Sequence, residues 1–231
     1  MKNKTLIVGG SGFLGKALIH ELEKKGHSIT VADIDAESLQ TDIDVKKINL
    51  DITDLDAFNE KLENNYDFIF NFAAIADIGE AEHKFMDAVD VNIGGCINTL
   101  KFASKCQPKR YIYASSMYVF GDKGGIYGAT KKISEILVEK FSEQFSFEHT
   151  LVRYGSLYGK GAHSWNSINK YISTIAKEKS ITHWGNGNET REYININDAA
   201  KMTSDCVEGK YANEAITITG QQKHTSREVI E

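Results

Sequence analysis

Three residues in the middle of the chain have side chains that could move a proton onto or off a hydroxyl group. Tyr127 and Lys131 lie four positions apart in YGATKK, which places both on one face of a helix. An ammonium group beside a phenol favours the phenolate and lowers the phenol pKa from its reference value of about 10. Ser116 ends the upstream segment RYIYASS, and its hydroxyl could hydrogen-bond the reacting oxygen. The same Tyr–Lys spacing occurs on ordinary solvated helix faces, so the surrounding motifs must decide.

A glycine-rich segment near the N-terminus, LIVGGSGFLGKA, could hold a phosphate-containing cofactor. It fits the dinucleotide-binding fingerprint through Gly10, Gly12 and Gly15. It also contains most of a P-loop, which would end at Lys16 and would then require Ser or Thr to hold Mg²⁺. The next residue is Ala17, which offers no oxygen to a metal. The segment therefore favours a dinucleotide whose pyrophosphate lies at a helix N-terminus.

An acidic residue ends the second apolar run, SITVAD. Asp33 follows Gly15 by 18 positions, where a carboxylate can accept hydrogen bonds from the adenosine ribose 2′-OH. The same charge would repel a 2′-phosphate, so the residue favours NAD over NADP. The alternative is an ordinary loop carboxylate, because acids are common in the neighbouring ADIDAES.

The elements that must position these residues can be predicted from the spacing of apolar side chains. Short apolar runs predict strands over 5–10, 28–33, 46–51, 66–74, 110–116 and 148–155. Helical spacing predicts helices over 13–25, 53–63 (with Thr53 as the cap), 82–105 and 127–145. This alternation predicts an α/β fold, a Rossmann-type doubly wound parallel sheet with helices on both faces.

The pattern loosens beyond about residue 155. An exposed amphipathic helix is expected over 167–180, and a strand, a Gly/Asn loop and a second strand over 180–194. We therefore expect residues 1–155 to form the dinucleotide-binding domain. Residues 156–231 would form a small, partial substrate lobe interleaved with it.

Composition excludes several other classes of protein. A net charge of −5 and a pI near 5.8 argue against a broad nucleic-acid interface. The seven histidines are scattered and predict no metal site, and the three cysteines indicate free thiols in a reducing compartment. The apolar run at the N-terminus is too short for a signal peptide, and no stretch is long enough to span a membrane. The expected location is the cytoplasm.

The order of these motifs resembles the extended short-chain dehydrogenases/reductases, in the group of NAD-dependent sugar-nucleotide epimerases and dehydratases. The similarity runs from VGGSGFLG to about Gly220. It implies NAD as cofactor, a sugar nucleotide as substrate, and a homodimer formed through the two long helices.

The resemblance also implies roles for individual residues. Ser116, Tyr127 and Lys131 would be the catalytic residues, Ser116 and Tyr127 would also contact the substrate, and Arg191 would pair with its diphosphate. Asp51 and Ile52 would flank the adenine, and Asn92 would support the site. The implied cofactor contacts come from Gly9, Gly12, Phe13, Leu14, Gly15, Asp33, Asp51, Ile52, Phe72, Ala73, Ala74, Asn92, Ser115, Tyr127, Lys131 and Tyr154.

The chain departs from the family pattern in several places. Met117 and Tyr118 follow Ser116 where the 4,6-dehydratases carry an Asp–Glu pair, so elimination would lack its usual acid and base. The loop that leads to Tyr127 is short. The chain stops at Glu231, where relatives continue, and SREVIE resembles an interrupted helix, so we expect truncation or a reduced substrate lobe.

The leading expectation for function is therefore a NAD-dependent sugar-nucleotide 4-epimerase. A keto-sugar-nucleotide reductase or dehydrogenase would use the same residues, and a 4,6-dehydratase is a further alternative. A non-catalytic NAD-binding regulatory or scaffold protein on the same fold belongs to another class. A P-loop ATPase is the remaining alternative, and the residue after Lys16 argues against it.

Overall fold

The main sheet of the protein has seven parallel strands. The computed structural model describes residues 2–183 and 185–231, and its main sheet has the order β3-β2-β1-β4-β5-β6-β9. The strands are β1 (Lys4–Val8), β2 (Ser28–Asp33), β3 (Lys46–Asn49), β4 (Phe68–Asn71), β5 (Arg110–Ser116), β6 (His149–Tyr154) and β9 (Glu214–Ile218). The chain order reverses between β1 and β4, and the carboxyl ends of strands at such a point form the ligand crevice of doubly wound folds.

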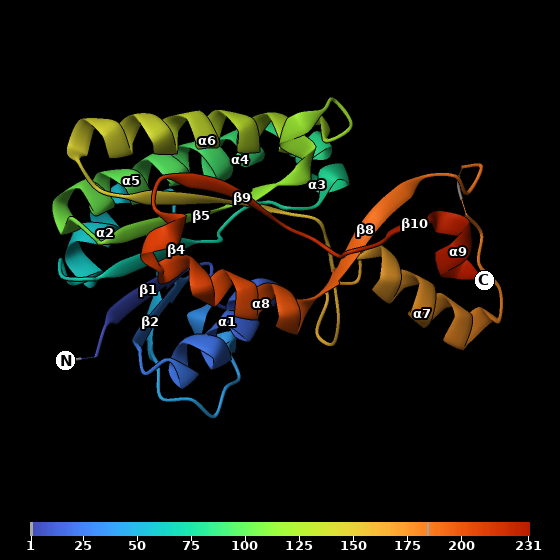
Figure 1. Cartoon of the computed structure of the whole chain (residues 1–231), viewed down its shortest axis with the longest axis horizontal. Helices are drawn as coiled ribbons and strands as arrows, with labels where there is room; N and C mark the ends of the chain where they lie inside the picture. The colour runs from blue at the N-terminus through green and yellow to red at the C-terminus, as the bar shows by residue number, and fades with distance from the viewer. Residues whose placement is uncertain (1, 184) are drawn as a thin grey trace.

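Helices cover both faces of this sheet, as Figure 1 shows. One face carries α2 (Leu55–Lys61), α3 (Ile78–His83), α4 (Phe85–Val89), α5 (Gly95–Cys106) and α6 (Gly125–Phe145), and the other carries α1 (Phe13–Lys24) and α8 (Ile196–Ser204). Side chains alternate between two cores, so Leu6 packs with α5 and α6 while the next residue, Ile7, packs with α1 and α8. The predicted doubly wound α/β fold is confirmed.

Two predicted helices differ in the structure. The helix expected over 82–105 is divided into α3, α4 and α5, with a π-helical turn over Asp90–Gly94. The helix α2 begins two residues later than predicted because Asp54, not Thr53, caps it. The Asp54 carboxylate accepts hydrogen bonds from the N–H groups of Asp56 and Ala57.

A second, smaller sheet lies beyond the carboxyl ends of the main strands. It contains β7 (Ser156–Tyr158), β8 (Thr190–Asn195) and β10 (Lys223–Thr225) in the order β10-β8-β7, together with α7 (Ser167–Glu178) and α9 (Ser226–Ile230). The strand expected just after residue 180 does not form in 180–183, and residue 184 lies outside the described residues. Figure 1 shows β8, β10, α7 and α9 projecting to one side.

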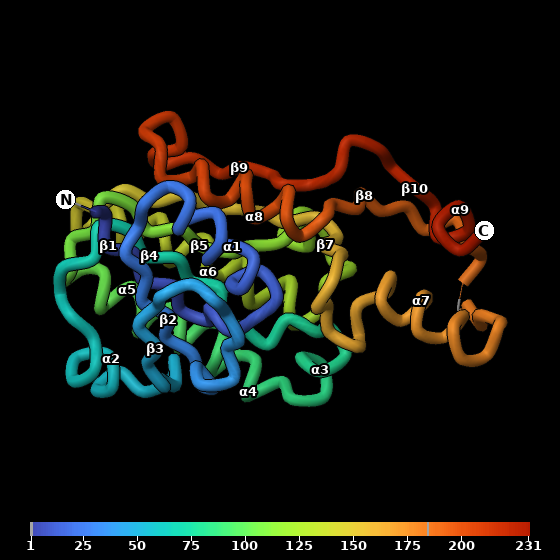
Figure 2. The backbone as a smooth tube through the Cα atoms, turned by 90° about the horizontal axis from the view of Figure 1, so that it is seen from below, coloured from blue at the N-terminus to red at the C-terminus, as the bar shows by residue number. Residues whose placement is uncertain are grey.

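The chain leaves this second lobe between β8 and β10. It runs back along α8 and β9, which lie side by side in Figure 2, and β9 pairs in parallel with β6. Residues after 155 therefore contribute to both sheets. Over the described residues, we find no helix that combines the length and the apolar character needed to cross a membrane.

Candidate active site

The chain leaves β1 through a glycine loop at the carboxyl edge of the main sheet. Gly9 has a φ of +79°, and a Cβ at this position would lie 2.5 Å from the backbone nitrogen of Ala73. A Cβ on Gly15, in the first turn of α1, would lie 2.6 Å from the Cα of Gly10. Gly9 therefore lets the loop approach the end of β4, and Gly15 lets α1 pack close to the loop.

The N-terminus of α1 has hydrogen-bonding capacity that an anion could use. In the described chain, Gly12 caps the helix without a side-chain hydrogen bond, and the first turn contains no acidic residue. The first N–H groups of a helix, here those of Phe13 and Leu14, have no acceptor within the helix. The buried Ser11 Oγ also has no hydrogen-bond partner in the part of the chain that the structure describes. These groups and the helix dipole fit the pyrophosphate of a dinucleotide.

The alternative P-loop does not fit this geometry. The helix α1 already begins at Phe13, and the backbone N–H of Lys16 donates to the Gly12 carbonyl at 3.0 Å, as an ordinary helical residue. The Lys16 side chain is exposed to solvent. The loop that would enclose a triphosphate is therefore replaced by helix, and the dinucleotide interpretation stands.

Asp33 lies at the end of β2 beside the glycine loop. Its Oδ2 accepts a hydrogen bond from the Ser11 N–H at 2.9 Å, and its Oδ1 accepts one from the Asp35 N–H at 3.1 Å. The carboxylate is thus fixed next to the loop that faces the pyrophosphate. This placement suits a contact with the ribose hydroxyls of the cofactor.

We expect Asp33→Asn to reduce the preference for NAD⁺ over NADP⁺ at least about tenfold. The amide oxygen can still accept the Ser11 N–H, but the charge that favours a 2′-OH and repels a 2′-phosphate is lost. Calorimetric titration with each cofactor measures the ratio of dissociation constants, with Asp35→Asn as the matched control. An unchanged ratio would show that the Asp33 charge does not select the cofactor.

The residues expected to flank the adenine lie at the outer end of this crevice. Asp51 Oδ1 accepts hydrogen bonds from both the N–H and the hydroxyl of Thr53, at 2.9 and 2.8 Å. Ile52 is buried beneath Gly95 of α5. Asp51 and Ile34, which is 74% exposed, line an open cavity of about 510 Å³. An exposed isoleucine at this edge is an apolar surface on which a flat base can pack.

The segment after β4, residues 72–74, forms the side of the crevice opposite Gly9. Asn92, in the π-helical turn, fixes Ile75, the residue that follows this segment. Its Oδ1 accepts the Ile75 N–H at 2.8 Å, and its Nδ2 donates to the Ile75 carbonyl at 3.1 Å and to Thr130 Oγ1 at 3.0 Å. The Asn92 amide therefore binds protein groups and positions the crevice wall.

The Ser–Tyr–Lys set comes together at the carboxyl end of β5. Ser116 is the last residue of β5, and Tyr127 and Lys131 lie in the first two turns of α6. Lys131 is 3% exposed, and its Nζ donates to the Ala114 carbonyl at 2.8 Å. The same nitrogen lies 5.9 Å from the centroid of the Tyr127 ring. The predicted convergence of these three residues is therefore present in the structure.

Burial governs the ionisation of Tyr127 and Lys131 in the absence of ligand. Burial raises the pKa of Tyr127 to about 12, against a smaller opposing effect of the Ser116 hydrogen bond. Burial also lowers the pKa of Lys131 to about 8. Burial is the largest influence on the phenol in the absence of ligand, and the Lys131 ammonium group is held on the Ala114 carbonyl. Tyr127 is therefore a neutral phenol at neutral pH in the absence of ligand.

We expect Lys131→Met to have a higher free energy of unfolding than the parent at about pH 7. We expect this difference to shrink by about 2 kcal/mol by about pH 9.5. The folded state disfavours the charged lysine, so the full destabilisation from burying that charge is present below the folded pKa of about 8. Between that value and the unfolded 10.5 the folded lysine deprotonates first, and the cost shrinks as pH rises. Urea unfolding at both pH values measures the difference. The prediction would be contradicted if Lys131→Met and the parent differed by the same free energy of unfolding at both pH values. It would also be contradicted if the exposed control Lys132→Met showed the same dependence on pH.

Two predicted cofactor contacts have side chains that point into the protein. The Ser115 hydroxyl donates to Glu135 Oε1 at 2.5 Å, and Glu135 also accepts two hydrogen bonds from Arg153, at 2.7 and 2.9 Å. The Tyr154 hydroxyl pairs with Thr203 Oγ1 at 2.8 Å in the core beneath α8. These two side chains are therefore structural here, and only their backbone atoms are left to contact a cofactor.

The second lobe reaches the site through Arg191 of β8. The exposed Arg191 side chain donates from Nη1 to the hydroxyl of Tyr118 at 2.8 Å. Tyr118 lies in the 3₁₀ turn Met117–Phe120 directly after Ser116, and its ring meets that of Tyr127 edge to face at 6.3 Å between centroids. In the sequence Tyr118 signals only a departure from the dehydratase pattern, so its place in the site could not be found from that signal.

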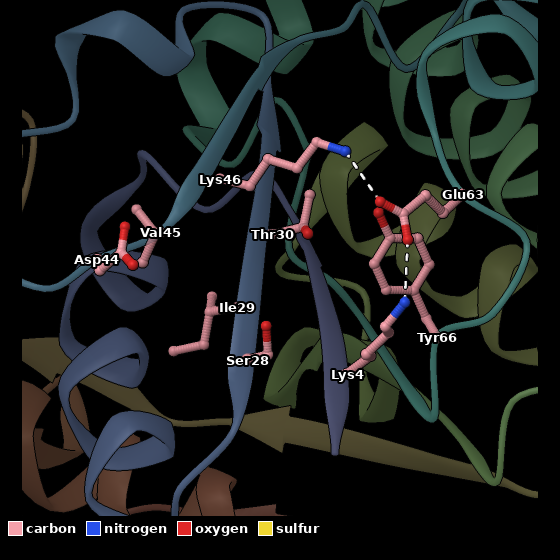
Figure 3. Close-up of a pocket in the computed structure, with 9 residues that line it drawn as sticks. All are labelled: Lys4, Ser28, Ile29, Thr30, Asp44, Val45, Lys46, Glu63 and Tyr66. Atoms are coloured by element: carbon pink, nitrogen blue, oxygen red, sulfur yellow. Dashed lines mark hydrogen bonds and ion pairs between the residues drawn. The ribbon is translucent and has the colours of Figure 1, made fainter. Parts of the chain in front are cut away.

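A separate cavity of about 270 Å³ lies at the opposite, amino edge of β1, β2 and β3 (Figure 3). Glu63 accepts hydrogen bonds there from Lys4 at 3.0 Å and from Lys46 at 3.1 Å, and these bonds lower the pKa of Glu63. Both lysines of this cavity therefore pair with the same carboxylate. It lies far from the Ser–Tyr–Lys set, and we assign it no part in the chemistry.

The fold and the site together are typical of an α/β enzyme that depends on NAD. The glycine loop lies at the switch point of the sheet, an acidic residue ends β2, and the proton-transfer residues follow β5. The chain belongs to the NAD dependent epimerase/dehydratase family, whose model matches residues 5–216. Its members are enzymes that depend on NAD, and the loop geometry described above fits that cofactor.

Known proteins show the same relationship at low identity. The chain is 29% identical over 256 residues to the UDP-N-acetyl-alpha-D-glucosaminuronate decarboxylase of Bacillus cytotoxicus, covering 99% of this chain and 78% of that protein. The UDP-glucose 4-epimerase of Thermotoga maritima, solved with UDP-glucose, superposes with a TM-score of 0.88 at 20% identity, covering 98% of this chain and 80% of that one. The enzyme WbmF of Bordetella bronchiseptica with NAD⁺ gives 0.87 at 18% identity, covering 99% and 76%. At these identities the structures establish the fold.

Proposed function

We propose that the protein is a sugar-nucleotide 4-epimerase that acts on a nucleoside diphosphate sugar. The observation that carries this proposal is the Ser116–Tyr127–Lys131 set at the end of β5, beside a crevice that fits NAD. The acid and base of a dehydratase are replaced by Met117 and Tyr118, so the residues present favour oxidation and reduction at one carbon over elimination. A solved UDP-glucose 4-epimerase shares the fold that this reaction would use.

The residues have distinct roles in this reaction. NAD, when bound, supplies the hydride acceptor for oxidation at C4 and the donor for its reversal. When NAD⁺ is bound, the positive charges of its nicotinamide ring and of Lys131 would oppose the effect of burial and favour the Tyr127 phenolate. The phenolate takes the proton of the C4 hydroxyl, and Ser116 hydrogen-bonds the same oxygen as it becomes a carbonyl. The Lys131 ammonium group stabilises the tyrosinate. Because burial raises the pKa of Tyr127, the phenol readily holds the proton until the ketone is reduced on its other face.

Mass spectrometry of ligands released from the purified protein, followed by NMR of its reaction with UDP-glucose, tests the proposal. We expect bound NAD and the appearance of the C4 epimer without net consumption of cofactor. Stoichiometric consumption of NADH by a keto-sugar nucleotide would instead indicate a reductase. Bound NAD with no turnover on any sugar nucleotide would indicate a regulatory or scaffold role.

A decarboxylase is the second candidate, and the similarity to the Bacillus cytotoxicus enzyme favours it. A carboxylate on C5 of a sugar lies beta to a ketone at C4, so the same oxidation by Tyr127 and Ser116 would prepare the loss of CO₂. Incubation with UDP-N-acetylglucosaminuronate separates the two candidates. Release of CO₂ identifies the decarboxylase, whereas a product of unchanged mass identifies the epimerase.

We also propose a homodimer in a reducing compartment such as the cytoplasm. The helices α4 and α6 pack together and expose four large apolar side chains: Phe85, Met86, Ile133 and Ile136. Such a patch is typical of an interface between copies of a chain, which light scattering tests directly. The three cysteines are free and buried, as expected for a chain that forms no disulfide.

A further inference from the structure

Tyr118 is held rigidly at the junction of the two lobes. Its backbone N–H donates to Ser116 Oγ at 3.3 Å. Two glycines of the α6 N-terminus lie against it: a Cβ on Gly124 would lie 2.6 Å from the Tyr118 Cβ, and one on Gly128 would lie 3.2 Å from the Tyr118 carbonyl oxygen. The ring meets Tyr127 at an interplanar angle of 78°. The backbone and ring of Tyr118 are therefore fixed relative to the residue that moves the proton.

The hydroxyl of Tyr118 is oriented by a cation that has no acidic partner. Arg191 donates one N–H to this hydroxyl, and the side chain is exposed. Across residues 2–183 and 185–231, no carboxylate lies within ion-pair distance of Arg191. A guanidinium group has five N–H donors, so four remain. The phenol, which accepts from Arg191, retains its own O–H to donate.

These two side chains together present several donors and one positive charge, an arrangement that recognises a phosphate oxygen. The fixed contact between the rings of Tyr118 and Tyr127 separates this anion position from the proton-transfer position. A glycosyl diphosphate has the matching layout, with a phosphate on C1 and the reacting hydroxyl across the sugar ring on C4.

We propose that Tyr118 is a substrate-binding residue that, together with Arg191, holds the sugar-proximal phosphate of a nucleoside diphosphate sugar and so sets C4 in front of Tyr127. This inference rests on the proposed function, because it assumes the same substrate class. It adds Tyr118, which follows β5 of the main sheet, to Arg191 of the second lobe as a group that recognises the substrate. It also gives the residue that replaces the dehydratase acid a role of its own.

Titration calorimetry of the NAD-loaded protein with UDP tests the proposal. We expect Tyr118→Phe to weaken UDP binding about tenfold, the loss of one hydrogen bond to a charged group. The ring is retained, so the melting temperature and the bound NAD should not change. The matched control is Tyr211→Phe, at the opposite end of the sheet before β9. We expect Arg191→Gln to weaken UDP binding further, and the double variant to lose less than the product of the two single effects, because the pair acts together.

Turnover of the sugar nucleotide gives a second readout. If Tyr118 holds the phosphate, Tyr118→Phe should raise KM about tenfold and change kcat less. UDP binding that is unchanged in Tyr118→Phe but weakened in Arg191→Gln would overturn the role of Tyr118 and leave the proposed function intact. Weakened UDP binding in a protein that epimerises no sugar would support the binding role and reject the proposed function. A parent that does not bind UDP would overturn the proposal.

Discussion

Replacing Tyr127 with phenylalanine is expected to lower kcat about 10³-fold, the effect of removing a positioned acid–base group. The phenol is the one group of the Ser–Tyr–Lys set that can both take and return the proton of the reacting hydroxyl. Its loss leaves Ser116, whose hydroxyl is too weak an acid to replace it, and Lys131, whose Nζ is held on the Ala114 carbonyl. Steady-state turnover of the sugar nucleotide, with the NAD content measured on the same preparation, gives the result.

The control for this experiment is Tyr211→Phe, which removes a tyrosine hydroxyl outside the site and should retain parental turnover. The Tyr127 variant should keep its NAD, because its ring remains in place beside Tyr118. A kcat within about tenfold of the parent would reject Tyr127 as the acid–base residue. Loss of NAD together with kcat would indicate that the hydroxyl holds the cofactor instead.

Replacing Gly9 with alanine is expected to abolish retention of NAD and to lower the free energy of unfolding by about 3 kcal/mol or more. Two effects act together at this position. The backbone has a φ of +79°, which a side chain tolerates poorly, and the new Cβ would lie 2.5 Å from the Ala73 nitrogen. Because the neighbour is backbone, the loop or the end of β4 must move, and this displaces the crevice itself. Urea unfolding and the cofactor content of the purified variant provide the two measurements.

Gly26 offers a matched control for this substitution. Its φ is +77°, but no atom of the described chain lies within 4 Å of a Cβ placed there. Gly26→Ala therefore carries the conformational cost alone, about 1 kcal/mol, and should retain NAD. If the two variants lost equal stability and both kept NAD, the close approach of Gly9 to the segment after β4 would have no part in forming the crevice.

Much of the main sheet could be predicted because its signals are local. Buried parallel strands are short apolar runs, and six of the seven strands were predicted at or near their observed positions. The seventh, β9, could not be assigned to this sheet, because no local pattern indicates that EAITI pairs with β6. The division of the helix over 82–105 was also missed. Its π-helical turn contains Asn92, which bonds to Ile75 and Thr130, and no local pattern indicates contacts so distant in sequence.

The positions of the central site residues could be predicted from the sequence, but their ionisation and their long-range contacts could not. Ser116, Tyr127 and Lys131 follow one strand closely, so topology alone brings them together. Their ionisation also depends on burial, which spacing does not reveal and which raises the pKa of Tyr127 in the absence of ligand. The bond between Tyr118 and Arg191 joins residues 73 positions apart, one in the turn after β5 and the other in β8 of the second sheet. Only the three-dimensional structure could reveal it.

The late position of β9 in the chain has a consequence for biosynthesis. The ribosome must make the 59 residues that separate Tyr154 from Glu214 before the strand that pairs with β6 can exist. During that interval the outer edge of β6 is an unpaired row of N–H and C=O groups, which can recruit strands from other chains. Nascent chains of this protein should therefore be most prone to aggregate, and most dependent on chaperones, while the second lobe is being translated.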